Sequence, residues 1–276
     1  MASAKLAAHA RRSYRRAMSP EFHGPRTAIV TGGAKRIGAE IARALSADGW
    51  HLVIHCNRSL GLGRALAEEL GNAVAIAADL AEPDAAGTIF ASAAGLPPVR
   101  LLVNNASQFV YDSADDFTVE RWDAHQAINL RAPALLSQAF ARAAAEEAGD
   151  AGGLIVNLID AKLAQPNPDF FTYTISKMGL AGLTELTARA LAARGIRVCA
   201  IAPSVTLVSG PQSRENFSKV HRLNALGRGV EVDQIVAALR FIISTPTLTG
   251  QIITLDAGQR FLSLPRDVQF LEQDHE

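Results

Sequence analysis

The sequence lacks a surplus of charge of either sign, because 27 basic side chains are balanced by 27 acidic ones. A nucleic-acid-binding protein needs an excess of Lys and Arg to displace counterions from phosphates, so the balance disfavours a nucleic-acid partner. No apolar run approaches the roughly 18 residues that a membrane-spanning helix requires. We therefore expect neither a nucleic-acid partner nor a membrane span.

Cysteine is scarce, with Cys56 and Cys199 the only two in 276 residues. Two cysteines in apolar stretches cannot form a disulfide scaffold, and a reducing, cytoplasmic compartment is the simplest interpretation. Hydrophobic residues make up 49% of the chain and charged residues 20%, so the chain can bury a sizeable core. The length allows one large α/β domain or two small ones.

The first 25 residues differ in composition from the rest. The basic residues that precede the first acidic residue, Glu21, are Lys5, Arg11, Arg12, Arg15 and Arg16. The segment has no apolar core of the kind found in secretory signals. We interpret residues 1–25 as a basic, disordered arm, with an organelle-targeting peptide as the alternative.

From Arg26 onward, short apolar runs alternate with segments of helical periodicity. The predicted strands are Thr27–Thr31, Leu52–His55, Ala73–Ala77, Val99–Asn104, Leu154–Leu158, Ile196–Ile201 and Gln251–Leu255. The predicted helices are Ile37–Ala47, Leu60–Leu70, Thr118–Ala148, Tyr173–Ala193 and Val232–Ser244. This alternation predicts a single-domain, Rossmann-type α/β fold, a doubly wound parallel sheet of about seven strands with helices on both faces.

The alternation predicts one domain over residues 26–261, and two segments depart from it. Pro203–Gly229 has little periodicity, and a loop of this length is typical of a lid or substrate-binding element, with disorder as the alternative. The C-terminal tail, 262–276, mixes apolar and charged residues. It either closes over a site, its own or a neighbour's, or frays as many termini do.

The first predicted strand runs into a glycine-rich turn and then a helix. Glycines at such a junction let backbone N–H groups approach a pyrophosphate at the positive end of the helix dipole. The literal G-x-G-x-x-G pattern is absent, and a tight turn without a ligand is the alternative. The residues expected to bind a dinucleotide here are Gly32, Lys35, Arg36, Ile37 and Gly38.

The end of the second predicted strand indicates which dinucleotide binds. An NAD enzyme places Asp or Glu about 20 residues beyond the glycines to hold the ribose 2′-hydroxyl. Here the residues are His55, Cys56, Asn57, Arg58 and Ser59, without an acid. Arg36 and Arg58 supply positive charge where a 2′-phosphate would lie, although both could be solvated surface charges. We predict NADP(H), bound by His55, Asn57, Arg58 and Ser59.

A catalytic pair opens the helix after the fifth predicted strand. Tyr173 and Lys177 are spaced i, i+4, which puts phenol and ammonium on one helical face. A nearby cation stabilises phenolate and brings the tyrosine pKa closer to working pH, so Tyr173 can donate or accept a proton.

These motifs together resemble those of the short-chain dehydrogenase/reductase family. Thr31–Gly38 is similar to its first-turn motif, with Arg36 where a middle glycine is common. Asn104-Asn105-Ala106 resembles its N-N-A motif, and Asn129 its helix asparagine, which would position water in a proton relay. The resemblance implies further cofactor contacts at Asp79, Leu80, Asn105, Ala106, Ser107, Tyr173, Lys177, Pro203 and Ser204.

One departure from the family pattern bears on the substrate. The family usually carries Ser thirteen residues before the tyrosine, where this chain has Asp160. An ionised carboxylate cannot donate a hydrogen bond to a carbonyl oxygen on which negative charge grows. Either Asp160 is protonated, or the reacting atom is not a carbonyl oxygen, as with a ring nitrogen that must be protonated. A decayed site in a pseudoenzyme is the remaining alternative.

Asp at this position resembles the pteridine reductase branch, which includes dihydromonapterin reductases. Asn105–Phe109 resembles that branch's N-A-S-x-F segment, in which the aromatic ring stacks on the pterin. Phe109 could also be a core residue. The resemblance implies that the substrate contacts Ser107, Phe109, Asp160 and Tyr173. The implied catalytic residues are Asn129, Asp160, Tyr173 and Lys177.

We therefore expect an NADPH-dependent reductase that transfers hydride to a pterin ring, with no metal. The alternatives are a carbonyl reductase acting on a ketone, sugar or 3-oxoacyl substrate, and a non-catalytic NADPH-binding sensor. The family resemblance also implies a homotetramer, in which the alanine-rich segments Ala132–Ala148 and Ala181–Ala193 could pack between subunits, although helix–sheet packing would use the same small residues.

Overall fold

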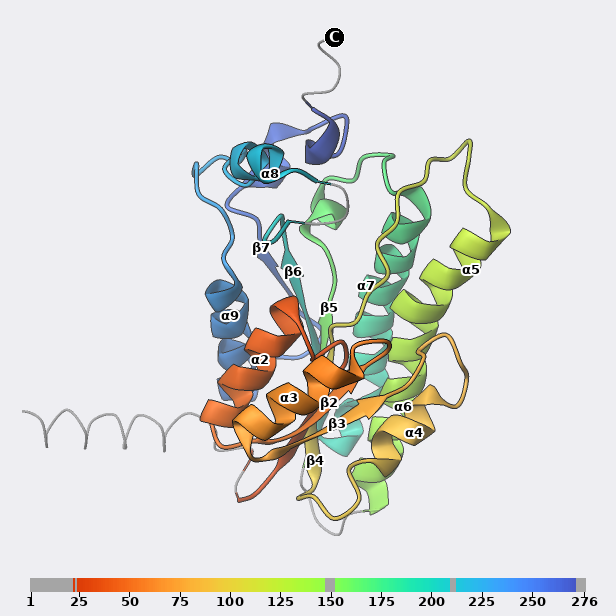
Figure 1. Ribbon diagram of the computed structural model, residues 1–276, viewed down its shortest axis with the longest axis vertical. Coiled ribbons are helices and arrows are strands. Elements are labelled where there is room, and N and C mark those ends of the chain that lie inside the picture. The colour runs from red at the N-terminus through yellow and green to blue at the C-terminus, as the bar shows by residue number, and fades with distance from the viewer. Residues whose placement is uncertain (1–21, 23, 147–151, 209–211, 272–276) are drawn as a thin grey trace, which may run out of the picture.

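The centre of the molecule is one sheet of seven parallel strands in the order β3-β2-β1-β4-β5-β6-β7 (Figure 1). The structure is a computed structural model that describes residues 22, 24–146, 152–208 and 212–271. The strands are β1 (Thr27–Val30), β2 (His51–Cys56), β3 (Ala73–Ala77), β4 (Val99–Asn104), β5 (Gly153–Leu158), β6 (Ile196–Pro203) and β7 (Ile252–Leu255). The predicted fold class is confirmed.

Helices connect the strands and cover both faces of the sheet (Figure 1). The α-helices are α2 (Arg36–Ala47), α3 (Leu60–Leu70), α4 (Ala85–Ala91), α5 (Val119–Gln126), α6 (Ala132–Glu146), α7 (Phe171–Leu191), α8 (Arg214–Val220) and α9 (Val232–Ser244). Short 3-10 turns are η2 (Ala161–Ala164), η3 (Ala192–Arg194), η4 (Gln259–Leu262) and η5 (Val268–Phe270), and η1 (Ala127–Arg131) is a π-helical turn.

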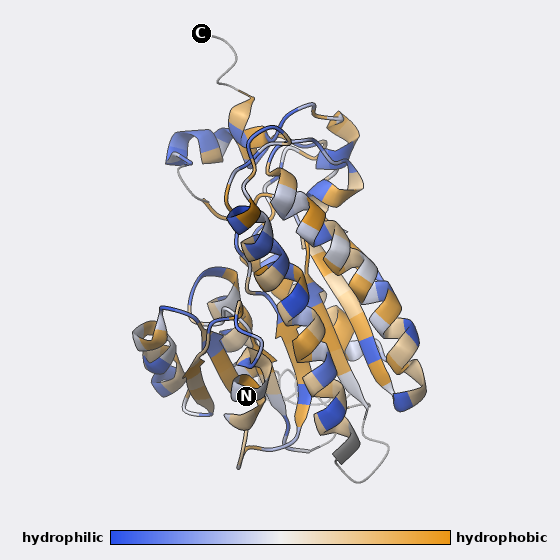
Figure 2. Ribbon diagram, turned by 90° about the vertical axis from the view of Figure 1, so that its right-hand side faces the viewer, coloured by the Kyte–Doolittle hydropathy of each residue, from blue (hydrophilic) through white to orange (hydrophobic). Residues whose placement is uncertain are grey.

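The core consists of two apolar layers, one on each side of the sheet. Neighbouring strand residues point to opposite faces, and both faces are apolar because both are covered by helices. Ala28 and Val30 pack with α2, α3 and α9, whereas Ile29 packs with α4, α6 and α7. Figure 2 shows the hydrophobic strands between helices that carry both hydrophilic and hydrophobic residues.

The predicted helix over Thr118–Ala148 is wrong as one continuous α-helix. The structure divides it into α5, the π-helical turn η1 and α6, and residues 147 and 148 lie outside the described part. The π-helical turn contains Asn129, whose side chain bonds the backbone of Gln108 and the hydroxyl of Ser176. π-Helical turns are frequent at functional sites, and this one sets the orientation of the asparagine.

Two short helices are absent from the sequence-based assignment. α4 has seven residues, most of them Ala, Gly or Thr, and shows too little periodicity to be recognised. α8 lies inside the predicted loop 203–229 and is capped by Ser213, whose hydroxyl accepts a hydrogen bond from the Asn216 backbone N–H. The prediction of a long irregular loop is therefore wrong for residues 214–220.

The folded part begins before the predicted boundary at Arg26. Phe22 is buried and meets the Trp50 ring edge-on at 5.7 Å, and the Arg26 guanidinium lies 4.5 Å from the centre of the same ring. The rest of the predicted arm, residues 1–21 and 23, lies outside the described residues. Among the helices that the structure describes, none combines the length and apolar composition needed to cross a bilayer.

Gly38, near the start of α2, tests how tightly the turn between β1 and α2 is packed. A Cβ atom there would lie 2.2 Å from the Gly32 carbonyl oxygen, and this backbone atom cannot move away cheaply. We expect Gly38→Ala to lower the free energy of unfolding by about 1–3 kcal/mol in urea denaturation. The matched control is Gly61→Ala on α3, where a Cβ meets no atom within 4 Å. The control should be neutral or slightly stabilising, and equal effects of the two changes would contradict the prediction.

Candidate active site

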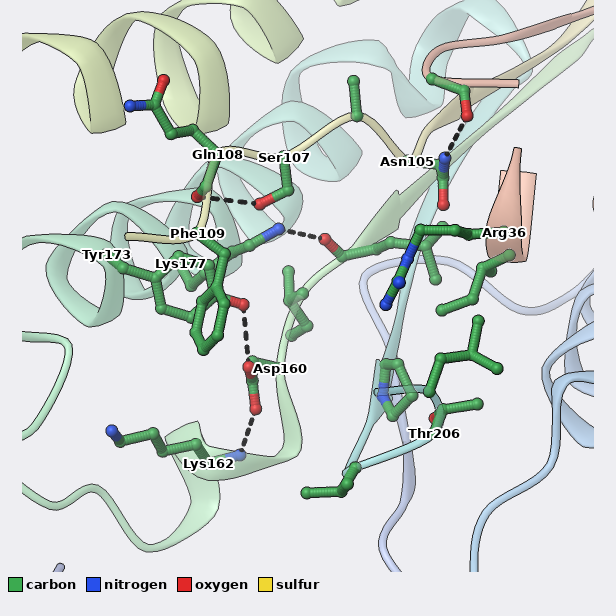
Figure 3. A pocket seen from close by; sticks show the side chains of 18 of the residues that line it. Arg36, Asn105, Ser107, Gln108, Phe109, Asp160, Lys162, Tyr173, Lys177 and Thr206 are labelled. Atoms are coloured by element: carbon green, nitrogen blue, oxygen red, sulfur yellow. Dashed lines mark hydrogen bonds between the residues drawn. The ribbon is translucent and has the colours of Figure 1, made fainter. Parts of the chain in front are cut away.

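The carboxyl ends of the strands open into one cavity of about 660 Å³, as expected for a ligand site in a parallel α/β sheet (Figure 3). The residues predicted to bind a cofactor all line it. They are Gly32, Lys35, Arg36, Ile37, Gly38, His55, Asn57, Arg58, Ser59, Asp79, Leu80, Asn105, Ala106, Ser107, Tyr173, Lys177, Pro203 and Ser204. Phe109 and Asp160 line the same cavity.

The glycine-rich turn between β1 and α2, called the first turn, has the tight backbone that close approach of a ligand requires. Gly32 adopts a left-handed conformation with φ of 61°. Arg36 is also left-handed, with φ of 55°, at the position where the family commonly has glycine. A non-glycine residue in this region costs on the order of 1–3 kcal/mol, which its surroundings must offset. The Arg36 guanidinium donates to the Val208 carbonyl at 2.8 Å and so connects the first turn to the loop after β6.

Buried side chains bond the turn after β1 to its neighbours. The Asn105 amide donates to the Thr31 carbonyl at 2.8 Å, and the Thr31 hydroxyl accepts from the backbone N–H groups of Asn105 and Ala106. On the other side, His55 Nδ1 accepts from the Gly32 backbone N–H at 3.3 Å. The other ring nitrogen therefore carries the hydrogen that bonds the Ala78 carbonyl at 3.0 Å. Burial lowers the pKa of His55, which favours this neutral form.

The Tyr173 hydroxyl donates a hydrogen bond to Asp160 Oδ2 at 2.8 Å (Figure 3). The other carboxylate oxygen accepts from the Lys162 backbone N–H at 2.8 Å. Asp160 is thus an acceptor on both sides, which suits an ionised carboxylate. The expectation that Lys177 brings the Tyr173 pKa toward neutrality is wrong for this structure, because burial and then the Asp160 charge raise that pKa well above its ordinary value. Tyr173 is held as a protonated phenol.

Lys177 lies one helical turn beyond Tyr173 and is fully enclosed. Its Nζ donates to the Leu158 carbonyl at 2.8 Å and lies 5.7 Å from the centre of the Tyr173 ring. Burial lowers its pKa to about 8, and the Asp160 charge opposes that effect. The ammonium is therefore positioned beside the phenol, and it is partly neutralised when the pH rises above about 8.

Asn129 does not line the cavity as the structure describes it, although the sequence placed it among the catalytic residues. Its oxygen accepts from the Gln108 backbone N–H at 2.8 Å and the Ser107 hydroxyl at 3.2 Å, while its amide donates to Gln108 O and Ser176 Oγ. All these bonds hold the loop after β4 against α7. Asn129 positions the cavity wall, and its part in a water relay stays a prediction.

Phe109 belongs to an aromatic cluster beside Tyr173. Its ring stacks on Phe170 with the centroids 4.2 Å apart and meets Tyr173 edge-on at 4.7 Å. Phe170 also contacts Tyr111 and Phe270. Phe170 therefore covers one face of the Phe109 ring, and a flat ligand would have to use the other face.

A buried polar network behind the cavity was not predicted from the sequence. His125 Nε2 accepts from the Val110 backbone N–H, so Nδ1 carries the hydrogen and donates to Thr172 Oγ1 at 2.6 Å. The Thr172 hydroxyl donates to the Asp112 carboxylate, which also accepts the Thr172 backbone N–H at 2.9 Å. His125 and Asp112 are fully buried. The network joins the loop that carries Phe109 to the first turn of α7, next to Tyr173.

Further cavity residues come from the C-terminal part of the chain. Leu264, Asp267, Val268 and Gln269 line the cavity, so the tail closes over a site of its own chain. Residues 272–276 of the predicted tail lie outside the described part. Within the described residues, no group of three His, Cys, Asp or Glu side chains is arranged to hold a metal ion.

Thr172→Val tests the buried network. Valine keeps the shape but removes the hydroxyl, leaving the buried Asp112 carboxylate and the His125 N–H without this partner. We expect the free energy of unfolding to fall by about 2–3 kcal/mol in urea denaturation, because unpaired buried groups pay their desolvation cost. The matched control is Thr88→Val on the exposed side of α4, which should change it by less than about 0.5 kcal/mol. Similar midpoints for the two variants would contradict the proposed energetic role.

Comparison with known proteins assigns the site to a family. The profile described as short chain dehydrogenase matches residues 26–218. An L-xylulose reductase from Mesocricetus auratus is 32% identical over 241 residues, 84% of this chain and 96% of that protein. A galactitol 2-dehydrogenase (L-tagatose-forming) from Cereibacter sphaeroides is 34% identical, covering 84% and 93%. The crystal structure of FolM alternative dihydrofolate reductase 1 from Brucella canis complexed with NADP has a TM-score of 0.81 at 39% identity, covering 86% of this chain and 94% of that one. The chain belongs to the short-chain dehydrogenase/reductase family of oxidoreductases, which use NAD(P)H.

Proposed function

We propose that this protein is an NADPH-dependent reductase of a pterin ring, of the type that converts a dihydropterin to a tetrahydropterin. The observation that carries the proposal is the hydrogen bond from the Tyr173 hydroxyl to Asp160. Both oxygens of that carboxylate accept hydrogen bonds, so the position offers no donor for a carbonyl oxygen on which negative charge develops. A ring nitrogen that needs a proton from Tyr173 has no such requirement.

The residues at the cofactor end of the cavity fit NADP(H). Gly38 leaves no room for a side chain beside the Gly32 carbonyl, so backbone groups of the turn stay accessible to a pyrophosphate. The residues directly after β2, Asn57, Arg58 and Ser59, include no acid, whereas Arg36 and Arg58 both line the cavity. The FolM structures from Brucella canis and Brucella suis were determined with NADP. When bound, the reduced cofactor would supply the hydride, and Lys177 would hold its nicotinamide ribose.

In the proposed reaction, one C=N bond of the substrate becomes CH–NH. Tyr173 donates its proton to the ring nitrogen while the adjacent carbon receives the hydride. The raised pKa of Tyr173 keeps the phenol protonated before the reaction. Afterwards the Lys177 ammonium stabilises the phenolate, whereas the Asp160 carboxylate repels it and favours its return to phenol by uptake of a solvent proton. Asp160 thus orients Tyr173 and drives its reprotonation.

The substrate ring would lie against Phe109. Phe170 packs behind Phe109 and holds its ring at right angles to that of Tyr173. A flat heteroaromatic ring on the remaining face gains about 0.5–1.5 kcal/mol from stacking beyond the area that it buries. The Ser107 hydroxyl, fixed by Asn129, lies on the same loop and would position the ring edge.

A carbonyl reductase of the ordinary family type is the second candidate. It is favoured by the relatives, since the matched proteins include L-xylulose reductase and a 3-oxoacyl-[acyl-carrier-protein] reductase from Synechocystis. It would require Asp160 to be neutral and to donate to the substrate oxygen. In either reaction the Tyr173 hydroxyl must leave Asp160 to donate its proton to the substrate.

Assembly and compartment remain predictions from the sequence. We propose a homotetramer built through α6 and α7, and α7 carries the exposed apolar side chains Met178 and Leu186 on its outer face. Both cysteines are buried and unpaired, in keeping with a cytoplasmic, reducing compartment, which we propose on the same grounds as before.

Asp160→Ser tests the assignment of the substrate class. Serine restores the donor that the family ordinarily carries, so NADPH oxidation with 7,8-dihydropterins should fall about tenfold or more, while oxidation with L-xylulose or another ketone should rise. Tyr173→Phe should abolish turnover of both classes, because it removes the proton donor. The rate at which the absorbance of the reduced nicotinamide is lost in steady state checks these outcomes.

Two results would count against the proposal. The first is wild-type protein that reduces ketones but no dihydropterin. The second is unchanged dihydropterin turnover in Tyr173→Phe. In either case the carbonyl reductase assignment, or a non-catalytic NADPH-binding role if nothing is reduced, would replace it.

Cofactor preference gives an independent prediction. We expect the wild-type protein to bind NADPH at least about tenfold more tightly than NADH, because arginines pair well with a 2′-phosphate. Arg58→Gln should weaken NADPH binding and leave NADH binding within about twofold, as measured by equilibrium fluorescence titration. Tighter binding of NADH by the wild-type protein would overturn the cofactor assignment.

A further inference from the structure

The segment from Leu264 to Phe270 forms part of the cavity wall, although it lies beyond the matched family region, residues 26–218. Its fixed position comes from Asp169, which precedes α7. The Asp169 carboxylate accepts the Arg266 guanidinium at 2.9 Å and the Asp267 backbone N–H at 2.7 Å. Phe270 then stacks on Phe170 with the centroids 5.9 Å apart. The backbone of Asp267 is therefore anchored to the same turn that carries Tyr173.

The Asp267 side chain is nearly enclosed, with an exposed fraction of 15%, and its carboxylate lines the cavity. One oxygen accepts from the Gln269 backbone N–H at 3.1 Å. The other lies 3.5 Å from Lys162 Nζ, but that ammonium makes a much shorter bond, 2.5 Å, to the Asp169 carbonyl. An ionised carboxylate can accept about four hydrogen bonds. Asp267 thus retains acceptor capacity that its protein partners do not fill.

The charge of Asp267 interacts with the proposed catalytic groups Asp160 and Tyr173. Lys162 connects the two acids, because its backbone N–H bonds Asp160 and its ammonium lies beside Asp267. Burial raises the pKa of Asp267, and the Asp160 charge adds to that effect. The Asp267 charge in turn raises the pKa of Tyr173. The substrate end of the cavity therefore presents two acids beside the phenol.

This charge pattern selects among substrates. The ammonium groups of Lys162 and Lys177 balance the two acids, and the Arg260 guanidinium is paired with Asp256 at 2.8 Å, so this end of the cavity has no excess of positive charge for an anionic substrate. The two carboxylates favour a neutral ring with hydrogen-bond donors on its edge, since a carboxylate accepts two parallel N–H bonds from an amidine-like group. The 2-amino-4-oxopyrimidine part of a pterin has this donor pattern.

We propose that Asp267 is a substrate-recognition residue that accepts hydrogen bonds from the amino-substituted pyrimidine edge of the substrate. The inference rests on the proposed pterin reductase function and adds a specificity-determining contact to it. Asp267 has no part in the proton transfer, which belongs to Tyr173. Its removal should therefore weaken substrate binding and leave the chemical step largely unchanged.

The test compares two ligands that differ in the proposed donor group, 7,8-dihydropterin with a 2-amino group and 7,8-dihydrolumazine with a 2-oxo group. Equilibrium binding is measured on the full chain saturated with NADP⁺, so that no turnover occurs. We expect Asp267→Asn to weaken dihydropterin binding about tenfold and dihydrolumazine binding less than about threefold. With NADPH, the KM for dihydropterin should rise about tenfold, and kcat should change less than about threefold.

Controls separate recognition from folding. Asp233→Asn removes an exposed acid on α9, far along the chain from the cavity wall, and should change neither affinity. Thermal unfolding reports whether Asp267→Asn keeps the wild-type fold, and Asp267→Ser serves as the second variant if it does not. The ratio of the two affinities is the decisive quantity, because undocking of the tail would weaken both ligands alike.

Different outcomes distinguish the inference from the function on which it rests. Equal losses for the two ligands, or no loss for either, would assign Asp267 to tail docking and overturn the inference while leaving dihydropterin reduction by the wild-type protein intact. Failure of the wild-type protein to bind or reduce dihydropterin would overturn the proposed function, and the inference with it.

Discussion

Parallel pairing brings the ends of seven strands to one edge of the sheet, and the turns that leave this edge must be held by something other than strand hydrogen bonds. Side chains supply those bonds here. Thr31 and Asn105 join the turns after β1 and β4, and His55 joins the turn after β1 to the end of β3. Asn129 holds the loop after β4 from the opposite side. The shape of the cavity depends on this shell of polar contacts.

The proton affinity of the Tyr173 phenol depends on its burial and on the negative charge of Asp160 beside it. A carboxylate beside a buried phenol opposes formation of phenolate, so the pair favours proton donation over proton abstraction. The Lys177 ammonium lies 5.7 Å from the centre of the phenol ring, and its positive charge opposes the effect of the carboxylate. The phenol is therefore protonated at rest and able to donate its proton. A serine in place of Asp160 would not add this negative charge beside the phenol.

Much of the fold could be predicted from the sequence because its signals are local. Apolar runs of strand length gave strand bounds that lie within two residues of those observed, and the glycine turn lay at the correct junction. The pair Tyr173 and Lys177 was recognisable because one helical turn separates them. The roles of the cavity residues as cofactor and substrate contacts are still untested.

The features that escaped sequence reasoning depend on contacts between distant parts of the chain. The π-helical turn orients Asn129 so that its side chain bonds Gln108 and Ser176, and no periodicity reveals these contacts. The bonds among Asp112, His125 and Thr172 join segments 47 and 60 residues apart. The position of Asp267 in the cavity wall depends on how Asp169 anchors the tail, and the buried position of Phe22 depends on Trp50.

The two ends of the cavity differ in how they are built. Turns that continue directly from the central strands form one end, and their backbone cannot open without disturbing the sheet. The other end includes a terminal segment held by side-chain contacts. Asp169 binds Arg266 and the Asp267 backbone, Lys162 lies beside the Asp267 carboxylate, and the Phe270 ring packs on Phe170 and Tyr111. Breaking those few contacts costs far less than unfolding the domain. Local opening at the terminal segment is therefore the least costly route for a small molecule into the cavity, because it leaves the edge of the sheet undisturbed.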